Sequence, residues 1–115
     1  MLPRYVYLVR DGRDAATSFY HHLHNQAGAA GGFEGSFEEF EAQWAAGELP
    51  YGRWVDHVKA WDAAAGDSRV LFVRYEDLVV EPRRQVLRIV QHCNLQVRYA
   101  TMILLFKIPV YVKVR

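Results

Sequence analysis

The sequence predicts an α/β domain with a parallel sheet, and two observations lead to this fold class. Tyr5–Val9 and Val70–Val73 are short apolar runs rich in β-branched and aromatic residues, which is typical of buried strands in a parallel sheet. Helical patterns separate the two runs, and strands separated by helices favour parallel pairing. The chain has 115 residues, of which 51% are hydrophobic, so it can form one small domain with a core.

The first strand leads directly into a predicted helix. Asp11 is a suitable N-cap, and Asp14 stands three residues later in a variant of the capping-box pattern. Apolar residues then recur at helical spacing to about Asn25. The segment 27–35 contains four glycines in nine residues, which predicts a flexible loop.

Two further helices are predicted before the second strand. Ser36 and Glu39 form a capping box, and Gly47 is well placed to end the helix that follows. Trp54 and Trp61 mark the next helix, which we expect to end near Gly66.

A last helix is expected after the Val70–Val73 strand. Pro82 suits its first turn, and one apolar face is predicted to include Val86, Ile89, Val90 and a buried Cys93. Beyond Leu95 the sequence has no clear period. We therefore predict a partial domain over residues 1–95 and a divergent tail over residues 96–115.

Composition excludes several function classes. The 14 basic and 13 acidic residues give a net charge of +1, which is no footprint for general nucleic-acid binding. The sequence shows no secretory signal and no apolar stretch long enough to cross a membrane. The single cysteine fits a reducing cytoplasm. The histidines of "HHLH" have no carboxylate or cysteine at metal-ligand spacing, so no metal is expected.

The end of the first strand is a candidate anion site. Arg10 offers a permanently charged planar fork, and the helix start offers backbone N–H groups and a partial positive charge. Ser18 lies about two turns beyond Asp11 on the same helix face. Spacing alone leaves an alternative, in which Arg10 pairs with Asp11 or Asp14 and Ser18 is a packed helix residue. The sequence contains no G-x-x-x-x-G-K-[ST] loop.

The second strand also ends in residues suited to a ligand. In "RYEDL", residues 74–78, Tyr75 offers a ring that can stack on a base and a hydroxyl that can form hydrogen bonds. Ligands of parallel sheets bind beyond the carboxyl ends of the strands, where both Arg10 and Tyr75 are expected.

Three segments together resemble the cytosolic-type sulfotransferase family. "YVYLVRDGRDAATSFYHH" is similar to the segment that binds the 3′-phosphate of 3′-phosphoadenosine 5′-phosphosulfate. "FEEFEAQWAAGELPYGRWVDHVKAW" and "VLFVRYEDLVVEP" are similar to two later segments of the family, in the same order. The resemblance covers about residues 5–95.

The resemblance implies a fold and residue roles. The fold would be an incomplete three-layer parallel-sheet fold, of the P-loop-like sulfotransferase type, that lacks the N-terminal phosphate-loop strand. Arg10 and Ser18 would bind the 3′-phosphate of the donor, and Tyr75 would contact its adenine. Phe19 and Tyr20 would lie toward a pocket for a small-molecule hydroxyl or amine acceptor.

The resemblance also implies missing parts. In the family a lysine-containing loop, which grips the 5′-phosphosulfate, and a catalytic histidine precede the strand equivalent to Tyr5–Val9. No histidine occurs here before His21. We therefore expect the isolated chain to be inactive and name no catalytic residue. The alternatives are a non-catalytic module that binds adenosine 3′,5′-bisphosphate or a partner chain, and another α/β phosphate-binding enzyme, which the missing phosphate loop disfavours.

Overall fold

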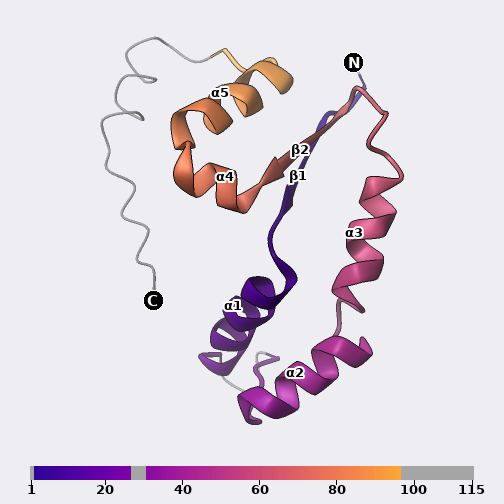
Figure 1. Ribbon diagram of the computed structural model, residues 1–115, viewed down its shortest axis with the longest axis vertical. Helices are drawn as coiled ribbons and strands as arrows, with labels where there is room; N and C mark the ends of the chain where they lie inside the picture. Colours follow the sequence, from indigo (N-terminus) through magenta and orange to yellow (C-terminus); the bar gives the residue numbers. More distant parts are fainter. Residues whose placement is uncertain (1, 27–30, 97–115) are drawn as a thin grey trace. The chain divides into compact units, whose positions relative to one another are not determined.

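The computed structural model describes residues 2–26 and 31–96, which belong to two units. One unit contains the described parts of residues 1–9 and 65–115, and the other contains those of residues 10–64. In chain order the elements are β1 (Tyr5–Val9), α1 (Gly12–His24), α2 (Phe37–Ala46), α3 (Trp54–Asp62), β2 (Val70–Arg74), α4 (Tyr75–Val80) and α5 (Pro82–His92) (Figure 1).

A two-stranded parallel sheet lies at the centre of the first unit. β1 pairs with β2 along its whole length, from Tyr5 opposite Val70 to Val9 opposite Arg74. Tyr7 and Phe72 are partners in this register, and their rings meet edge to face with centroids 5.5 Å apart. The predicted parallel pairing is confirmed.

The prediction that β1 is a buried strand is wrong for the described residues. Only Tyr7 is buried, and its burial raises the pKa of its hydroxyl, whereas Leu8 is 50% exposed and Tyr5 and Val6 are exposed as well. In β2, by contrast, Val73 is fully buried. The difference arises because α4 and α5 pack against β2, whereas in the described part of the chain β1 has one strand neighbour.

Two helices follow β2, where the sequence predicted one. α4 has only six residues, too few to show a helical period. Glu81 then leaves the helical region (φ −127°, ψ 60°), as expected for a residue before proline, and Pro82 occupies the first turn of α5 as predicted. Two side chains of α5 differ from expectation, since Gln85 is buried and Cys93 is a half-buried C-cap.

A polar network fastens α5 to the sheet. Arg88 donates from Nη1 to Oε1 of the buried Gln85 (2.6 Å) and from Nη2 to the carbonyl oxygen of Phe72 (3.4 Å). The pair satisfies the polar atoms that α5 would otherwise bury against β2. This explains why a glutamine occupies a core position.

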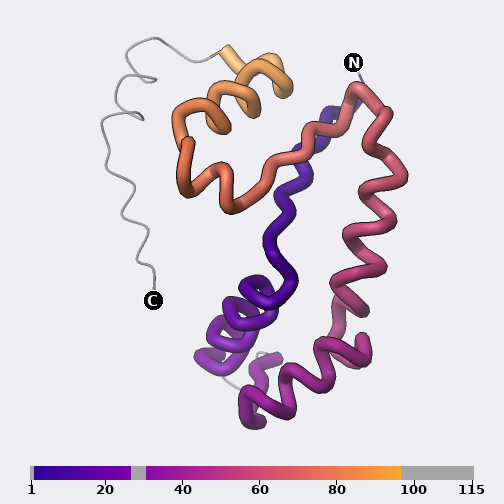
Figure 2. Tube along the Cα trace, viewed as in Figure 1, coloured from indigo at the N-terminus to yellow at the C-terminus, as the bar shows by residue number. Residues whose placement is uncertain are grey.

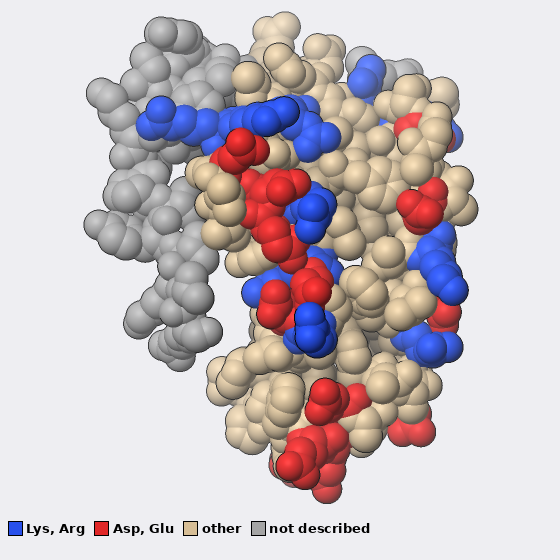
Figure 3. All heavy atoms as spheres, viewed as in Figure 1, with Lys and Arg blue, Asp and Glu red and all other residues tan. Residues whose placement is uncertain are grey.

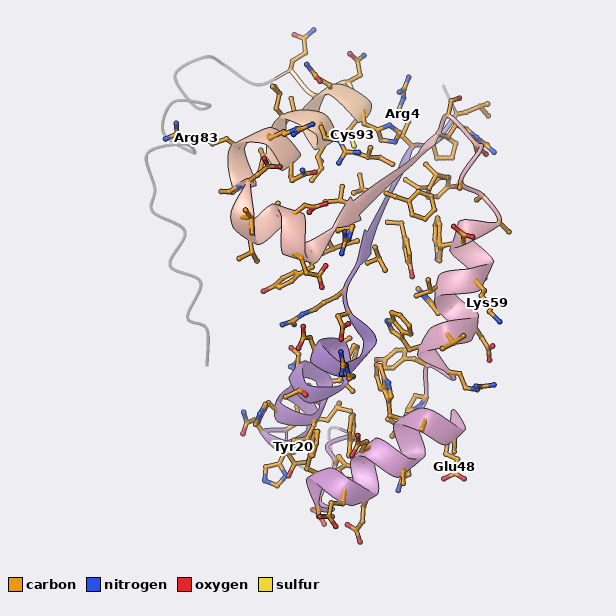
Figure 4. The ribbon with its side chains drawn as sticks, in the orientation of Figure 1. Arg4, Tyr20, Glu48, Lys59, Arg83 and Cys93 are labelled. Atoms are coloured by element: carbon orange, nitrogen blue, oxygen red, sulfur yellow. The ribbon has the colours of Figure 1, made fainter. Side chains whose placement is uncertain are left out.

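A second network holds the end of α5 at the start of the sheet. Nε2 of His92 lies 2.9 Å from the carbonyl oxygen of Arg69 and 3.1 Å from that of Tyr5. Both partners are acceptors, so Nε2 carries the proton. Arg4 also donates to the carbonyl oxygen of His92 at 2.8 Å, and Figure 4 shows Arg4 close to the end of α5. Together these bonds join the last turn of α5 to both strands.

The second unit contains three helices whose ends follow the predicted signals. Ser36 and Glu39 make both bonds of the capping box, and Gly47 ends α2 in the left-handed conformation (φ 76°). α3 ends at Asp62, before the predicted stop at Gly66. Phe40 is fully buried, between α1 and α2, and its ring meets those of Tyr20, Phe33 and Trp44.

Several sequence predictions lie wholly or partly outside the described residues. The glycine-rich loop is described only from Gly31 onward, and of the predicted tail only Gln96 is described (Figure 2). Across the described residues, no helix is both long and apolar enough to cross a membrane. Acidic and basic side chains are interspersed on the face in Figure 3, in line with the net charge of +1.

Candidate functional site

Arg10 and Tyr75 directly follow the two paired strands. Because Val9 is opposite Arg74 in the register, β1 and β2 end at the same edge of the sheet. Arg10 is the residue after β1 and is half-buried, and Tyr75 is the first residue of α4 and is also half-buried. The sequence predicted this edge correctly from the end of each apolar run.

Ser18 lies on the exposed surface of α1, as the helical spacing predicts. Seven residues separate it from Asp11, so the two positions differ by about 20° around the helix. Among the described residues the Ser18 hydroxyl makes no hydrogen bond, which distinguishes it from Thr17, whose Oγ1 donates to the carbonyl oxygen of Arg13 (3.0 Å). The Ser18 hydroxyl is therefore able to donate to a ligand.

The start of α1 has fewer free backbone N–H groups for an anion than the sequence suggested. Oδ1 of Asp11 accepts from the backbone N–H of Arg13 at 3.0 Å and from that of Asp14 at 3.4 Å. These are two of the groups that an uncapped helix would present to a phosphate. Asp11 is confirmed as the N-cap, and the same bonds leave Arg10 and Ser18 as the candidate phosphate donors.

Phe19 and Tyr20 belong to an aromatic cluster between α1 and α2. The Phe19 ring lies 5.7 Å from those of Trp44 and Tyr51, and the Tyr20 ring lies 5.2 Å from that of Phe37. Figure 4 labels Tyr20 beside α1. The cluster provides an apolar surface, and a role toward an acceptor stays a prediction.

A cleft of about 700 Å³ opens on a different face of α1. Its wall on α1 is formed by Gly12, Arg13, Ala16 and Thr17, whose mean direction differs from that of Ser18 by about 170° around the helix. Neither Arg10 nor Ser18 lines it. The cleft was not foreseen, because its walls come from three segments far apart in the sequence.

Trp54 lines this cleft and packs on the start of α1. A Cβ atom on Gly12 would lie 3.1 Å from two atoms of the Trp54 ring, so only glycine permits this close packing without a shift. The sequence used Trp54 to mark the start of a helix, and Trp54 is the first residue of α3.

The sequence matches a known family along most of the chain. The model of the family described as "Sulfotransferase domain" matches residues 2–107. The chain belongs to the sulfotransferase family. The match includes Arg10, Ser18 and Tyr75, and it confirms the resemblance found in the sequence.

Curated sulfotransferases are similar over the same region. The chain is 40% identical to sulfotransferase 1E1 of Mus musculus over 86 residues, which are 75% of this chain and 28% of that protein. It is also 40% identical to sulfotransferase 1E1 of Homo sapiens over 85 residues, or 74% of this chain and 28% of that protein. The chain therefore spans less than a third of the length of these relatives.

Solved sulfotransferase-type structures share the fold. Mouse sulfotransferase SULT7A1, solved in complex with PAP, superposes with a TM-score of 0.76 at 24% identity, over 88% of this chain and 36% of that one. Retinol dehydratase, solved with androsterone and the inactive cofactor PAP, superposes with a TM-score of 0.71 at 26% identity, over 89% of this chain and 29% of that one. The described elements thus form part of the α/β sulfotransferase fold.

Proposed function

We propose that this sulfotransferase chain carries the 3′-phosphate half of a donor site for 3′-phosphoadenosine 5′-phosphosulfate. In this proposal Arg10 and Ser18 bind the 3′-phosphate, and Tyr75 contacts the adenine. The observation that carries it is the family match over residues 2–107, which includes all three residues. The presence of PAP in two similar structures supports the same class of nucleotide.

The described side chains fit the proposed phosphate. Arg10 is half-buried, so its charge is screened less than that of a fully exposed arginine, and a charge-assisted bond to phosphate is worth about 1.5–3 kcal/mol. Asp11 is a nearby carboxylate that would repel an anion. Its bonds to two backbone N–H groups offset part of that repulsion, because they place its charge on the positive end of α1.

The reaction proposed for the complete site is sulfuryl transfer to a small-molecule hydroxyl or amine. The bond between the donor's sulfur and its leaving phosphate oxygen breaks, and a bond from sulfur to the acceptor oxygen or nitrogen forms. The acceptor's proton passes to a base. The residues of this chain contribute donor binding, which positions the group that is transferred.

We propose that the 115-residue chain by itself does not catalyse sulfuryl transfer. The family's lysine-containing phosphate loop and its histidine have no counterpart among the motifs in this sequence, and loss of a general base alone costs about 10²–10⁴ in rate. The alternative function is therefore non-catalytic binding of adenosine 3′,5′-bisphosphate. The proposed location is the cytoplasm, which the single cysteine supports.

Calorimetry and a turnover assay test the two parts separately. Adenosine 3′,5′-bisphosphate should bind the chain at least tenfold more tightly than adenosine 5′-monophosphate, which lacks the 3′-phosphate. Equal affinity for the two nucleotides would contradict the donor site. The turnover assay uses the donor with a panel of phenols, alcohols and amines. Formation of a sulfated product would contradict the proposed inactivity of the chain but would not contradict the donor site.

A further inference from the structure

We propose that the cleft between the starts of α1 and α3 and the side of α2 binds a flat aromatic anion, such as a fused-ring carboxylate. This site is separate from the proposed nucleotide site, since neither Arg10 nor Ser18 lines it. Its volume of about 700 Å³ falls within the range typical of small-molecule sites.

The walls of the cleft favour a flat aromatic body. Trp44 and Trp54 each present a half-buried indole, and Phe37 adds a third ring. Small side chains also line the cleft, with Ala16 on α1 and Ala45 on α2. A cleft lined by aromatic rings and small side chains suits a planar ligand that stacks on the exposed ring surface.

The guanidinium groups of the cleft offer binding groups for an anion. Its lining contains Arg13, Arg53, Asp11 and Glu41, so the formal charges balance. The Asp11 carboxylate is already engaged by two backbone N–H groups, and its closest approach to the Arg13 guanidinium is 3.7 Å, from Nε. Within the described residues, no hydrogen bond or ion pair engages the Arg53 guanidinium or the Nη atoms of Arg13.

Arg13 is thus paired with Asp11 through Nε, and the Arg53 guanidinium is the cation of the lining that is available to a ligand. The Arg13 side chain is 94% exposed and Arg53 is exposed as well, so both can turn toward a bound carboxylate. Arginine suits this task, because its planar fork both pairs with carboxylates and stacks on aromatic rings.

Saturation-transfer NMR with 2-naphthoate on the 115-residue chain tests the proposal. We expect saturable binding, and weaker binding of the neutral analogue 2-naphthol. Arg53→Gln should weaken naphthoate binding about two- to fivefold, as for an exposed ion pair, and Glu41→Gln should tighten it by a similar factor. Lys59→Gln is the matched control, because Lys59 is an exposed cation of α3 that does not line the cleft (Figure 4).

A steric variant tests the location without removing a core side chain. Ala45→Leu would fill the cleft and should abolish binding, whereas Ala46→Leu adds the same volume to an exposed neighbour outside the lining and should not. Excess adenosine 3′,5′-bisphosphate should leave naphthoate binding unchanged. The proposal is overturned by an absence of saturable binding, by charge effects of opposite sign, by equal effects of the two leucine variants, or by displacement by the nucleotide.

Discussion

Replacing His92 by alanine should loosen the amino-terminal end of the sheet. In the folded chain its Nε2–H is shared between the carbonyl oxygens of Arg69 (2.9 Å) and Tyr5 (3.1 Å). The bond from Arg4 goes to the His92 backbone and survives the substitution. His92→Ala therefore removes one side-chain link between α5 and both strands.

The free energy lost in His92→Ala depends on which hydrogen bonds the carbonyl groups of Arg69 and Tyr5 keep. Arg69 keeps the bond from the backbone N–H of Tyr5 at 2.8 Å, so its oxygen stays satisfied. Tyr5 stays paired with Val70 in the parallel ladder, so its carbonyl group keeps its place in the sheet. The loss is therefore about one net hydrogen bond, or about 0.5–1.5 kcal/mol. A loss of that size corresponds to opening about 2–13 times more often.

Amide hydrogen exchange read by mass spectrometry measures this opening directly. Peptides that cover β1 and β2 should exchange about 2–13 times faster in His92→Ala, because exchange reports local opening of the sheet. Gln91→Ala is the matched control, since Gln91 is an exposed neighbour on the same helix. If the two variants exchanged at the same rate, the fastening role of His92 would be refuted.

Three further predictions concern stability. The bonds from Arg69 hold the pKa of Asp67 at about 2, below its ordinary 3.8, so Asp67 stabilises the fold above about pH 3.8 and this contribution is lost as the pH falls toward 2. The unfolding free energies of wild type and Asp67→Asn should converge over that range, and a constant difference would contradict the reasoning. Phe40→Ala should cost about 3–5 kcal/mol in urea unfolding, because Phe40 is fully buried, whereas Phe37→Ala, at an exposed ring, should cost much less. Gly47→Ala should cost about 1–2 kcal/mol in the same assay, because Gly47 has a φ of 76°; an unchanged midpoint would count against this.

Local sequence signals predicted the helix ends and the strand ends. Ser36 with Glu39, Gly47 and Pro82 each carry a conformational preference that does not depend on distant residues. Arg10 was placed correctly for the same reason, since it marks where the apolar run of β1 ends. Capping chemistry and strand composition were therefore sufficient to place Arg10 at the end of β1, and its role toward a phosphate stays a prediction.

Local sequence signals did not predict which residues are buried or where the cleft lies. Leu8 is as apolar as a core residue, yet its exposure depends on which elements cover β1. Gln85 is buried because Arg88, three residues later, pairs with it against β2. The Trp54 ring meets Gly12 across 42 positions of sequence, a contact that no periodicity reveals.

The effect of Arg10 on binding of the 3′-phosphate tests the central claim most directly. Dissociation constants are measured by calorimetry for wild type and Arg10→Gln, each with adenosine 3′,5′-bisphosphate and with adenosine 5′-monophosphate. Arg10→Gln should weaken the bisphosphate about 10- to 100-fold, as expected for a lost charge-assisted bond, and leave the monophosphate unchanged. Equal weakening of both nucleotides, or no weakening of either, would contradict the assignment of Arg10 to the 3′-phosphate.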